Sequence, residues 1–519
     1  MLQLDVRMLQ LGGQPLALKE IAEIASGKVR LELPPAALAQ MEASRRVVQR
    51  VAGEHVPVYG INTGFGKLCE VRIADDAIER LQLNLVRSHA CGLGRPLSEE
   101  ETRVVIALRA NTLALGYSGV RPLIAETLIA MVNGGALAVI PEKGSVGASG
   151  DLAPLAHLAL SVIGEGEATW QGTRLPSREA LRLAGIEPVR LEAKEGLALL
   201  NGTQALTAVG GLALWRASRV VGLADVAGTM SLEALLGTPV AFDPRIHAAR
   251  PHAGQAATAA HLRKLLEGSD VDPSRRKTPA HVQDAYSLRC MPQVHGAVRS
   301  ALAYARAAVE TETGSATDNP LVFAETGDVL SGGNFHGAPL ALAFDSAAIA
   351  MTTLGAIAER RIDRLVNPDL NDGLPAFLAS APGVSSGFMI AQVAAASLLN
   401  ESKVLAHPAS VDSLPTSGGQ EDHVSMGMTA AKKLRAIVEN AEYLVAIELL
   451  AAAEALRYRD PFEPGPQIRR VVEVIRSIAP PLVEDRPLSV DIEATAAAIR
   501  QGRFDEWAFT EPRPQGAVL

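Results

Sequence analysis

The sequence predicts a mainly α-helical protein, with a long central helical bundle and a smaller mixed N-terminal region. Hydrophobic residues make up 48% of the 519 residues, but aromatic residues make up only 4%, so Ala and Leu dominate the apolar material. These two residues lose little freedom in a helix, whereas strands favour β-branched and aromatic residues. We expect residues 1–115 to form the mixed region and residues 116–519 the helical region.

The mixed region begins with short alternating segments and one amphipathic helix. Residues 2–13 and 28–33 alternate between apolar and other side chains, which is typical of short strands, and residues 36–52 follow the helical period. A glycine-bearing loop follows at residues 58–68, and a second glycine- and proline-punctuated loop covers residues 134–154. The mixed region therefore offers loops on which functional side chains can lie.

Four long stretches beyond this region have the composition of buried helices. Each has roughly 30 residues, or ~45 Å of helix at 1.5 Å per residue. They are residues 196–237, 282–312, 336–366 and 426–460. Their apolar residues cover much of the circumference, which is typical of helices buried among other helices. We expect a central bundle shared with other subunits, followed by shorter helices after Pro461.

The bulk composition excludes several classes of protein. The net charge is −8, and an acidic chain with mixed charges is not typical of a nucleic-acid-binding protein. Three cysteines fit a reducing cytoplasm better than a disulfide framework. The N-terminus lacks the apolar core of a signal peptide, and each long apolar run contains a polar or charged residue, so no membrane span is expected. No metal site is expected, because the histidines are not in ligand spacing, including these four: His252, His281, His295 and His336.

The run GSVGASGDLAPLAHLAL, residues 144–160, is the most informative segment. One interpretation is a glycine-rich turn leading into a helix, with Asp151 near the cap and Pro154 in the first turn. A phosphate-binding loop is excluded, because no Lys follows the glycines and no dinucleotide fingerprint is present.

The whole run closely resembles the signature of the aromatic amino-acid ammonia-lyases. In that family an Ala-Ser-Gly triplet cyclises and loses two waters, which gives a methylidene-imidazolone (MIO) group without an external cofactor. The resemblance assigns this role to Ala148, Ser149 and Gly150. The residue types suit the chemistry: Gly150 lets its nitrogen approach the Ala148 carbonyl, and Ser149 can lose its hydroxyl to become an alkene.

Six further segments resemble the same family in the right order across nearly the whole chain. VYGINTGFG, residues 58–66, contains Tyr59, which the resemblance makes the base that takes the β-proton. A phenol is a poor base at its ordinary pKa near 10, so the phenolate needs positive charge or hydrogen bonds nearby. KEGLALLNGTQ, residues 194–204, offers Asn201 in a helical context. Its implied role is to contact the ring and the substrate amine, although an Asn can also simply satisfy backbone groups.

QDAYSLRCMPQVHGA, residues 283–297, presents three polar side chains at a spacing of three residues. On a helix Gln283, Tyr286 and Arg289 would all point to much the same side. The planar guanidinium of Arg289 suits a substrate carboxylate, because it can bind both oxygens. By resemblance Tyr286 and Gln283 complete the site.

SGGNFHGAP, residues 331–339, places Phe335 in a glycine-rich turn, and in the family this position packs near the reactive ring. A core Phe is an almost equally good interpretation on chemistry alone. The run ahead of it, ETGSATDNPLVF, resembles a family loop, except that Gly314 stands where Asn is expected.

Two places favour the histidine-type members of the family. In NLVRSHACGLG, residues 84–94, the pair Ser88-His89 is the histidine type, whereas phenylalanine-specific relatives have a Phe-Leu-like pair and tyrosine-specific relatives a His-Leu-like pair. In TSGGQEDHVSMG, residues 416–427, Glu421 can accept a hydrogen bond from an imidazole N–H. Glu421 can also be a solvated residue, and Gly418 and Gly419 replace the usual Ala-Asn of this loop.

The resemblance therefore implies deamination of L-histidine to trans-urocanate and ammonia, the first step of histidine degradation. The amine would add to the methylidene carbon, or the ring would attack the imidazole, while Arg289 holds the carboxylate and His89 and Glu421 orient the imidazole. It also implies a homotetramer whose active sites draw residues from more than one subunit. The alternatives are a tyrosine or phenylalanine ammonia-lyase, an MIO-dependent aminomutase, and a catalytically silent helical assembly protein.

Overall fold

The computed structural model describes residues 7–53, 57–64, 66, 70–271 and 282–508. Within it the chain forms two compact units, each assembled from three separate stretches of sequence. Unit 1 comprises Met1–Trp215, Ala305–Asp345 and Pro408–Lys432. Unit 2 comprises Arg216–Tyr304, Ser346–His407 and Lys433–Leu519. The division of the sequence near residue 115 stays a prediction.

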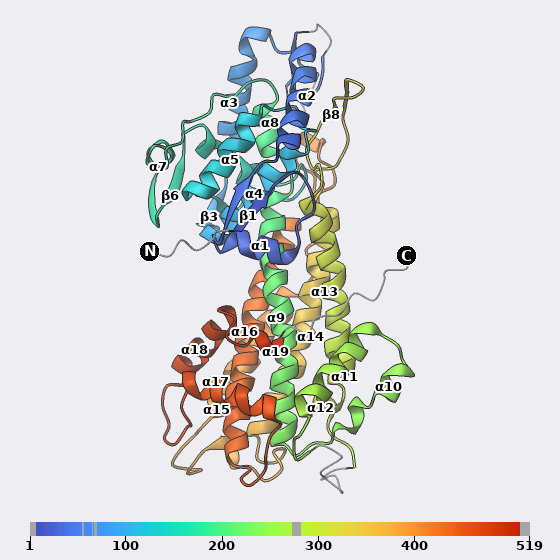
Figure 1. The fold of residues 1–519 in the computed structure, drawn as a ribbon, viewed down its shortest axis with the longest axis vertical. Helices are drawn as coiled ribbons and strands as arrows, with labels where there is room; N and C mark the ends of the chain where they lie inside the picture. Colours follow the sequence, from blue (N-terminus) through green and yellow to red (C-terminus); the bar gives the residue numbers. More distant parts are fainter. Residues whose placement is uncertain (1–6, 54–56, 65, 67–69, 272–281, 509–519) are drawn as a thin grey trace. The chain divides into compact units, whose positions relative to one another are not determined.

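Unit 1 contains the mixed α/β elements (Figure 1). Its first part comprises β1 (Arg7–Gln10), α1 (Leu18–Ala25), β2 (Val29–Glu32), α2 (Pro35–Ala52), η2 (Asp75–Ala77), α3 (Ile78–His89), β3 (Leu93–Pro96), α4 (Glu99–Ala114) and α5 (Pro122–Gly134). The first two strands pair in parallel. Helix α4 packs against α1, α2 and α5 and is buried around most of its circumference. A capping box between Ser98 and Glu101 begins it, which satisfies otherwise unpaired N–H groups.

The second part of unit 1 adds short sheets and the helices that lie beside the reactive run, by which we mean residues 144–160 with the triplet Ala148-Ser149-Gly150. It comprises β4 (Ala136–Ala138), β5 (Pro141–Lys143), α6 (Leu152–Val162), β6 (Glu167–Trp170), β7 (Thr173–Pro176), α7 (Ser177–Leu183), α8 (Glu195–Leu200), β8 (Leu321–Phe323), β9 (Asp328–Leu330) and η5 (Ser417–Gly419). The sheets have the orders β3-β5, β4-β6-β7 and β8-β9, all antiparallel. Helices α3, α6 and α8 pack together and form the platform of the site.

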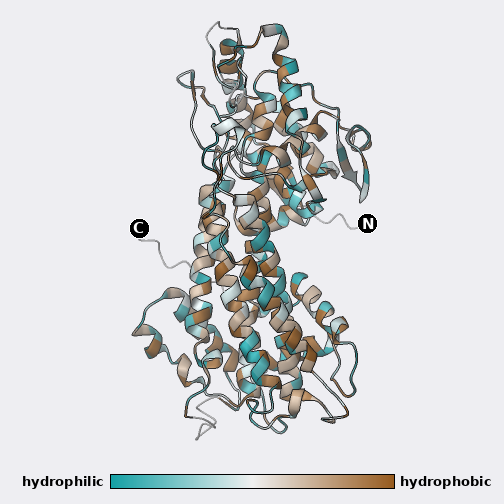
Figure 2. Cartoon of the chain, turned by 180° about the vertical axis from the view of Figure 1, so that it is seen from behind, coloured by the Kyte–Doolittle hydropathy of each residue, from teal (hydrophilic) through white to brown (hydrophobic). Residues whose placement is uncertain are grey.

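Four long helices have residues in both units: α9 (Gln204–Ala234), α13 (Met291–Thr313), α14 (Ala338–Val366) and α16 (Gly427–Arg457). Within unit 2 their close packing is visible at glycines. A Cβ on Gly228 of α9 would lie 2.3 Å from Sδ of Met291 in α13, and one on Gly355 of α14 would lie 2.9 Å from Leu444 in α16. Hydrophobic residues recur along these helices (Figure 2). The prediction of a mainly α protein built on long bundled helices is confirmed.

The rest of unit 2 consists of shorter helices around the bundle. They are η3 (Pro239–Phe242), α10 (Pro244–Ala248), α11 (Ala253–Leu266), α12 (Tyr286–Arg289), η4 (Ala376–Leu378), α15 (Met389–Leu405), α17 (Pro466–Ile478), α18 (Leu488–Arg500) and α19 (Asp505–Ala508). Helix α11 packs against α10 and α17, and α17 packs against α18. The short C-terminal helices expected after Pro461 are therefore present.

Two of the four predicted helices differ from the expectation. The stretch 196–237 is not continuous, because Asn201 ends α8 in an extended conformation before α9 begins at Gln204. The Gly202 carbonyl here accepts the Asp151 N–H at 2.7 Å, a bond outside the helix. The stretch 282–312 becomes helical only at Tyr286 and breaks after α12. Pro292 lacks the N–H that a continuous helix needs at this point.

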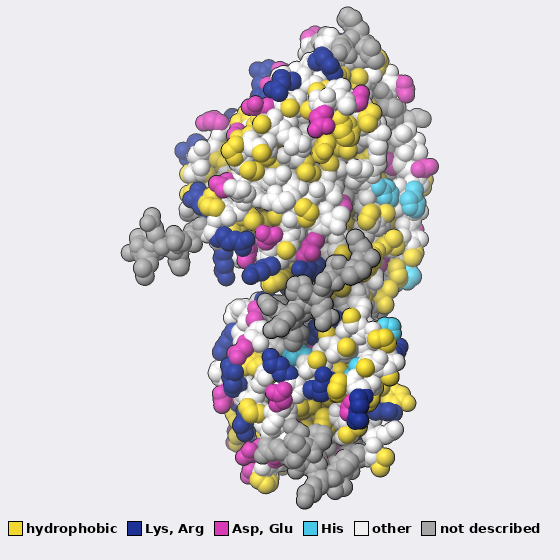
Figure 3. Space-filling view, turned by 45° about the vertical axis from the view of Figure 1, so that its right-hand side comes forward, with side chains coloured by type: hydrophobic (Ala, Val, Ile, Leu, Met, Phe, Trp, Pro, Cys, Tyr) yellow, Lys and Arg dark blue, Asp and Glu magenta, His cyan; other side chains and the backbone are white. Residues whose placement is uncertain are grey.

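Helix α14 is long and apolar enough to cross a membrane by length and composition alone, and 56% of its apolar window is buried within the structure. A mostly buried core helix passes the same test. Basic and acidic side chains lie interspersed on the face shown in Figure 3, in keeping with the mixed charge of the sequence.

Candidate active site

The triplet Ala148-Ser149-Gly150 lies in unit 1, in the turn between β5 and α6. Gly150 has a φ of +71°, and its backbone pairs with that of Gly202 in a short bridge. A Cβ on Gly150 would lie 2.2 Å from the Gly202 carbonyl oxygen. Glycine is therefore required here by both the backbone conformation and the close approach of a second chain segment.

Two other loops also hold the turn, through hydrogen bonds to Val146 and Gly147. The Gly147 carbonyl accepts hydrogen bonds from Ser425 Oγ at 2.9 Å and from the Gly337 N–H at 3.3 Å. The Met426 N–H donates to the Val146 carbonyl at 2.8 Å. The loop that carries Phe335 and the loop that carries Glu421 thus meet at the reactive run, although they are about 90 residues apart in sequence.

Asp151 is the N-cap residue of α6, in agreement with the sequence, but its side chain makes no capping hydrogen bond to that helix. Its carboxylate accepts the Leu206 N–H at 2.7 Å and the Ser145 hydroxyl at 2.7 Å, so it satisfies the N-terminus of α9 instead. The side chain is fully buried. Burial raises the pKa of Asp151 to about 6, against the opposing effect of these donors.

Glu421 contacts the triplet directly. Ser149 Oγ donates to Glu421 Oε1 at 2.7 Å, and Thr416 Oγ1 donates to Oε2 at 2.5 Å. The turn between Thr416 and Glu421 contains Gly418 and Gly419, with φ of +63° and +85°. The two glycines that depart from the family pattern therefore suit the backbone that brings Glu421 to Ser149.

Asn201, the C-cap residue of α8, also contacts the triplet. Its Nδ2 donates to the Ser149 carbonyl at 3.0 Å, while its Oδ1 is buried without a hydrogen-bond partner among the described residues. The Asn201 carbonyl accepts from Nη1 of Arg109 at 2.9 Å, and the same Nη1 donates to Gln204 at 2.8 Å. Arg109 is fully buried in α4, and burial lowers its pKa to about 10.

The loop that carries Tyr59 lies close to helix α8 and to the turn that leads to Glu421. A Cβ on Gly60 would lie 2.7 Å from Leu197 of α8, and one on Gly66 would lie 2.8 Å from Ser417 Oγ. Asn62 is fully buried and its Oδ1 accepts the Val58 N–H at 2.7 Å. The half-buried Tyr59 therefore lies on a loop anchored between α8 and the Glu421 turn.

His89 is the last residue of α3, which packs against α6 and α8. Its Nδ1 is 3.0 Å from the Ser88 hydroxyl. Burial lowers the pKa of His89, while a hydrogen bond to Leu85 and the charge of Glu421 oppose that effect. The ring thus lies within electrostatic reach of the carboxylate that contacts Ser149.

Phe335 is half-buried in the turn at residues 334–335 that precedes α14. The next residue, His336, stacks on His423 with ring centroids 5.8 Å apart and an interplanar angle of 6°. This stack connects the Phe335 turn to the Glu421 loop. Gly314 departs from the family pattern, and a Cβ on it would lie 2.4 Å from the nitrogen of Pro15. In this chain a side chain at 314 would require the N-terminal segment to shift.

The remaining predicted site residues belong to unit 2. Arg289 lies with its Cζ 4.5 Å from the ring centroid of Tyr286, so the two form a cation–π pair. Arg289 Nε is buried without a hydrogen-bond partner among the described residues, and Tyr286 is 70% exposed. Gln283 is exposed and precedes α12, so the prediction that all three residues share one helix is wrong for Gln283. Residues 282–285 before α12 are non-helical, and the Asp284 carboxylate accepts the Thr238 N–H.

The structure thus joins the triplet to Asn201 and Glu421 by hydrogen bonds and brings the loops of Tyr59, His89 and Phe335 to the same part of unit 1. Sequence reasoning did not identify the residues that hydrogen-bond to the triplet's neighbours and hold them in place. Ser145, Thr416 and Ser425 lie in the same motifs as the predicted residues and could have been found from their hydroxyls. Arg109 also had a signal, as a lone cation in the apolar run VVIALRANTLAL.

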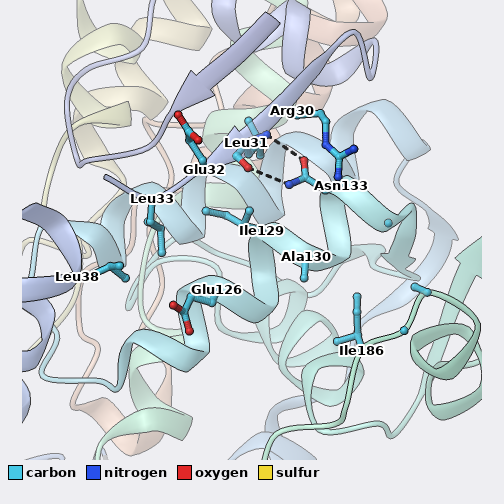
Figure 4. A pocket seen from close by; sticks show the side chains of 13 residues that line it. Arg30, Leu31, Glu32, Leu33, Leu38, Glu126, Ile129, Ala130, Asn133 and Ile186 are labelled. Atoms are coloured by element: carbon cyan, nitrogen blue, oxygen red, sulfur yellow. Dashed lines mark hydrogen bonds between the residues drawn. The ribbon is translucent and has the colours of Figure 1, made fainter. Parts of the chain in front are cut away.

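A groove of about 520 Å³ lies elsewhere in unit 1, between β2, α5 and residues 184–186 (Figure 4). In it the Asn133 amide accepts from the Leu31 N–H and donates to the Leu31 carbonyl, each at 2.9 Å. Asn133 therefore satisfies the strand edge of β2. None of the predicted site residues lines this groove.

Comparison with known proteins gives a consistent result. A family model described as aromatic amino acid lyase matches residues 16–477. A histidine ammonia-lyase of Stigmatella aurantiaca is 55% identical over 507 residues, which cover 98% of this chain and 99% of the relative. A solved histidine ammonia-lyase from Trypanosoma cruzi is 42% identical, with a TM-score of 0.90 over 96% of this chain and 95% of that one. A tyrosine aminomutase from Streptomyces globisporus is 38% identical, with a TM-score of 0.91 over 96% of this chain and 98% of that one.

Proposed function

The chain belongs to the aromatic amino acid lyase family, and we propose that it is a carbon–nitrogen lyase that converts L-histidine to trans-urocanate and ammonia, the first step of histidine degradation. The observation that carries the proposal is the position of Glu421. Its carboxylate accepts a hydrogen bond from Ser149 of the triplet and contributes to the electrostatic environment of His89. An acid and an imidazole beside the reactive triplet suit a substrate with an imidazole ring.

The residues around the triplet fit the MIO group that this family uses. Gly150 has no side chain where a Cβ would meet Gly202. Asn201 already binds the Ser149 carbonyl, and its buried Oδ1 is available for a further donor. When formed, the group supplies an electrophilic alkene. Asn201 and the backbone of Gly202 would hold it, with no external cofactor, and loss of the Ser149 hydroxyl would leave Glu421 Oε1 able to accept another donor.

The resemblance to the family assigns a role to each remaining residue. Arg289 binds the substrate carboxylate with its planar guanidinium, and the ring of Tyr286 restricts that guanidinium from one side. Glu421 accepts the imidazole N–H, and His89 orients the ring. Tyr59 takes the β-proton. Phe335 packs near the triplet and Gln283 completes the site. Such positioning supplies several kcal/mol of the barrier.

The test is near-ultraviolet absorbance during incubation with L-histidine, L-tyrosine and L-phenylalanine in parallel, with Ser149→Ala as the control. We expect urocanate from histidine only, and none from the control. Cinnamate or coumarate instead would keep the triplet chemistry and contradict the roles of His89 and Glu421. A Ser149→Ala variant with undiminished activity would contradict the use of the triplet.

An aminomutase is the second candidate, favoured by the likeness to the tyrosine aminomutase structure. Such an enzyme would return the amine to the β-carbon. Product analysis by mass spectrometry after incubation with L-histidine separates the two, since β-histidine has the mass of the substrate and urocanate is lighter by one ammonia.

The pair Ser88-His89 gives a further test of substrate choice. The double variant Ser88→His/His89→Leu has the tyrosine-type pair, and we expect it to lose histidine turnover and gain tyrosine turnover.

We also propose that the protein is a homotetramer with shared active sites. Several large apolar side chains on α14 and α15 are exposed in the single chain, which is unusual for so many on neighbouring helices. They include Ile349, Ile390, Val393 and Val404. Light scattering after size exclusion should give the mass of four chains, and a monomer would contradict the proposal.

The two described cysteines, Cys91 and Cys290, are unpaired, which supports a cytoplasmic location. Cell fractionation tests this location.

A further inference from the structure

A network of buried charged side chains in unit 2 lies next to the segment that carries Tyr286 and Arg289. At its centre Asp225 of α9 accepts hydrogen bonds from Nδ1 of His261 at 2.8 Å, from Nδ1 of His295 at 2.7 Å and from Arg299 at 2.5 Å. Because the Asp225 carboxylate binds Nδ1, the Nδ1 of His295 carries the proton and its Nε2 is left as an acceptor. That Nε2 faces Nη1 of Arg361 at 3.3 Å.

Arg361 of α14 is fully buried, and its guanidinium contacts three other residues. It binds Glu448 of α16 through Nε–Oε1 at 2.6 Å and Nη2–Oε2 at 2.9 Å. Its Nη1 faces His295 and also donates to the Ser287 carbonyl at 3.4 Å. Ser287 belongs to α12, between Tyr286 and Arg289. The carboxylate of Glu448 is fixed in turn by the Ser231 hydroxyl at 2.8 Å, so the direction of the guanidinium is determined.

The other end of this segment is also held by a buried carboxylate. Asp284 is buried, and its Oδ2 accepts the Thr238 N–H at 2.7 Å. Between the two anchors, Ala285 has an extended backbone and is the N-cap residue of α12, and Leu288 is buried. Residues 284–289 are therefore held by Asp284 at one end and by Arg361 near the other, while Tyr286 and Arg289 project from the same short segment.

We propose that Arg361 is a positioning residue, which holds α12 so that the Arg289–Tyr286 pair presents a preformed site for the substrate carboxylate. The proposal rests on the carboxylate-binding role given to Arg289 above. Bidentate binding of a carboxylate depends on the direction of the guanidinium plane, so a small rotation of α12 weakens it. Buried ion pairs contribute little net stability compared with apolar residues of the same volume, which favours a geometric role for Arg361 and Glu448.

The test compares Arg361→Lys with Ser231→Ala in the full-length enzyme. Lysine keeps the charge but lacks the planar fork, so it cannot bind Glu448 bidentately and reach Ser287 at once. Ser231→Ala removes a hydrogen bond from the same Glu448 carboxylate without contacting α12, and so controls for general damage to the network. Binding is measured with two competitive probes: imidazole-4-propionate, which has the ring and the carboxylate, and histamine, which has the ring and the amine.

For Arg361→Lys we expect the KM for L-histidine and the Ki of imidazole-4-propionate to rise about tenfold, as loss of one oriented charge-assisted contact would produce. The Ki of histamine should stay within about twofold of wild type. Ser231→Ala should leave the ratio of the two Ki values at the wild-type value. Equal weakening of both probes, or of neither, would overturn the proposal, because a merely structural residue would not distinguish them.

Two further variants keep the outcome interpretable. If Arg361→Lys does not fold, Asp284→Ala releases the other anchor of the segment, and the same loss confined to the carboxylate probe is expected; its absence would overturn the proposal. Arg289→Ala tests the proposed function separately. If Arg289→Ala does not weaken imidazole-4-propionate, the role of Arg289 itself is wrong. If Arg289→Ala does weaken it and Arg361→Lys does not, only the positioning role fails.

Discussion

Asp151 in unit 1 and Asp225 in unit 2 are both fully buried, yet their carboxylates are stabilised in opposite ways. Among the residues that the structure describes, Asp151 has only neutral donors, the Ser145 hydroxyl and backbone N–H groups at the start of α9. Burial therefore prevails and raises its pKa to about 6. Burial also opposes ionisation of Asp225, but Arg299 and two histidine hydrogen bonds outweigh it and hold its pKa well below the usual range.

The difference follows from the groups that surround each carboxylate. In unit 1 the site forms where irregular backbone segments meet, and backbone N–H groups are the donors at hand. In unit 2 Asp225 and Glu448 lie on long packed helices, and each is paired with a guanidinium that comes from another helix. A carboxylate held by neutral donors can change its protonation near neutral pH, whereas one held by cations is fixed as an anion.

The largest expected effect comes from removing the charge of each aspartate at pH 8. Asp225→Asn leaves Arg299 and its neighbours without their counter-charge, so we expect a loss of about 3–5 kcal/mol of unfolding free energy. Asp151→Asn keeps an oxygen for the Leu206 N–H and removes an unfavourable buried charge, so its cost should stay within about 1 kcal/mol. Thermal and chemical denaturation measure both. Equal costs would show that the two carboxylates do not differ as described.

The pH dependence of unfolding sharpens the same comparison. The pKa of Asp151 rises from 3.8 to about 6 on folding, so its contribution to stability is fully present below about pH 4 and is lost as the pH rises through about 6. The difference in unfolding free energy between wild type and Asp151→Asn should fall by about 3 kcal/mol across this window. Denaturation series at several pH values measure it. A pH-independent difference would contradict the raised pKa.

Two glycines of unit 1 allow the cost of a left-handed backbone to be measured separately from the cost of a side-chain clash. Gly150 and Gly172 have nearly the same φ, +71° and +77°, but a Cβ on Gly172 would have nothing within 4 Å. Gly172→Ala should cost about 1–2 kcal/mol, from the left-handed backbone alone. Gly150→Ala should cost roughly 2 kcal/mol more, because its Cβ meets Gly202, and should abolish activity. Equal costs in thermal denaturation would remove the packing argument at Gly150.

The smallest expected effect concerns a single neutral donor. Thr416→Val removes the hydroxyl that donates to Glu421 Oε2, and one such bond contributes about 1 kcal/mol. We expect the KM for L-histidine to rise about fivefold, with thermal stability nearly unchanged. Thr416→Ser, which keeps the hydroxyl, is the matched control. A KM that stays at the wild-type value in Thr416→Val would show that Thr416 does not orient Glu421.

The sequence predicted what depends on local pattern and missed what depends on contacts between distant segments. The long helices at 336–366 and 426–460 follow from their composition, and α14 and α16 confirm them. The break at Asn201 was not predictable, because it depends on the pairing of Gly202 with Gly150. Capping of α9 by Asp151 has the same cause. The roles given to Tyr59, Asn201, Tyr286 and the other site residues stay predictions.

Arg361 shows the same limit for the buried network. Its sequence context, AERRIDRL, is typical of a solvated helix face with several charges. Only packing separates the fully buried Arg361 from its exposed neighbour Arg360. A helical period alone does not show which of two adjacent arginines faces the bundle when both are charged.

The central claim is that the turn held between Gly202, Ser425 and Glu421 converts Ala148-Ser149-Gly150 into the electrophile that deaminates L-histidine. The most direct measurement is the mass of the proteolytic peptide that contains residues 148–150, taken from protein with histidine-deaminating activity. We predict a peptide lighter than its sequence by two water molecules, and the full calculated mass in the inactive Ser149→Ala variant. Active wild-type protein whose peptide has the full calculated mass would contradict the account.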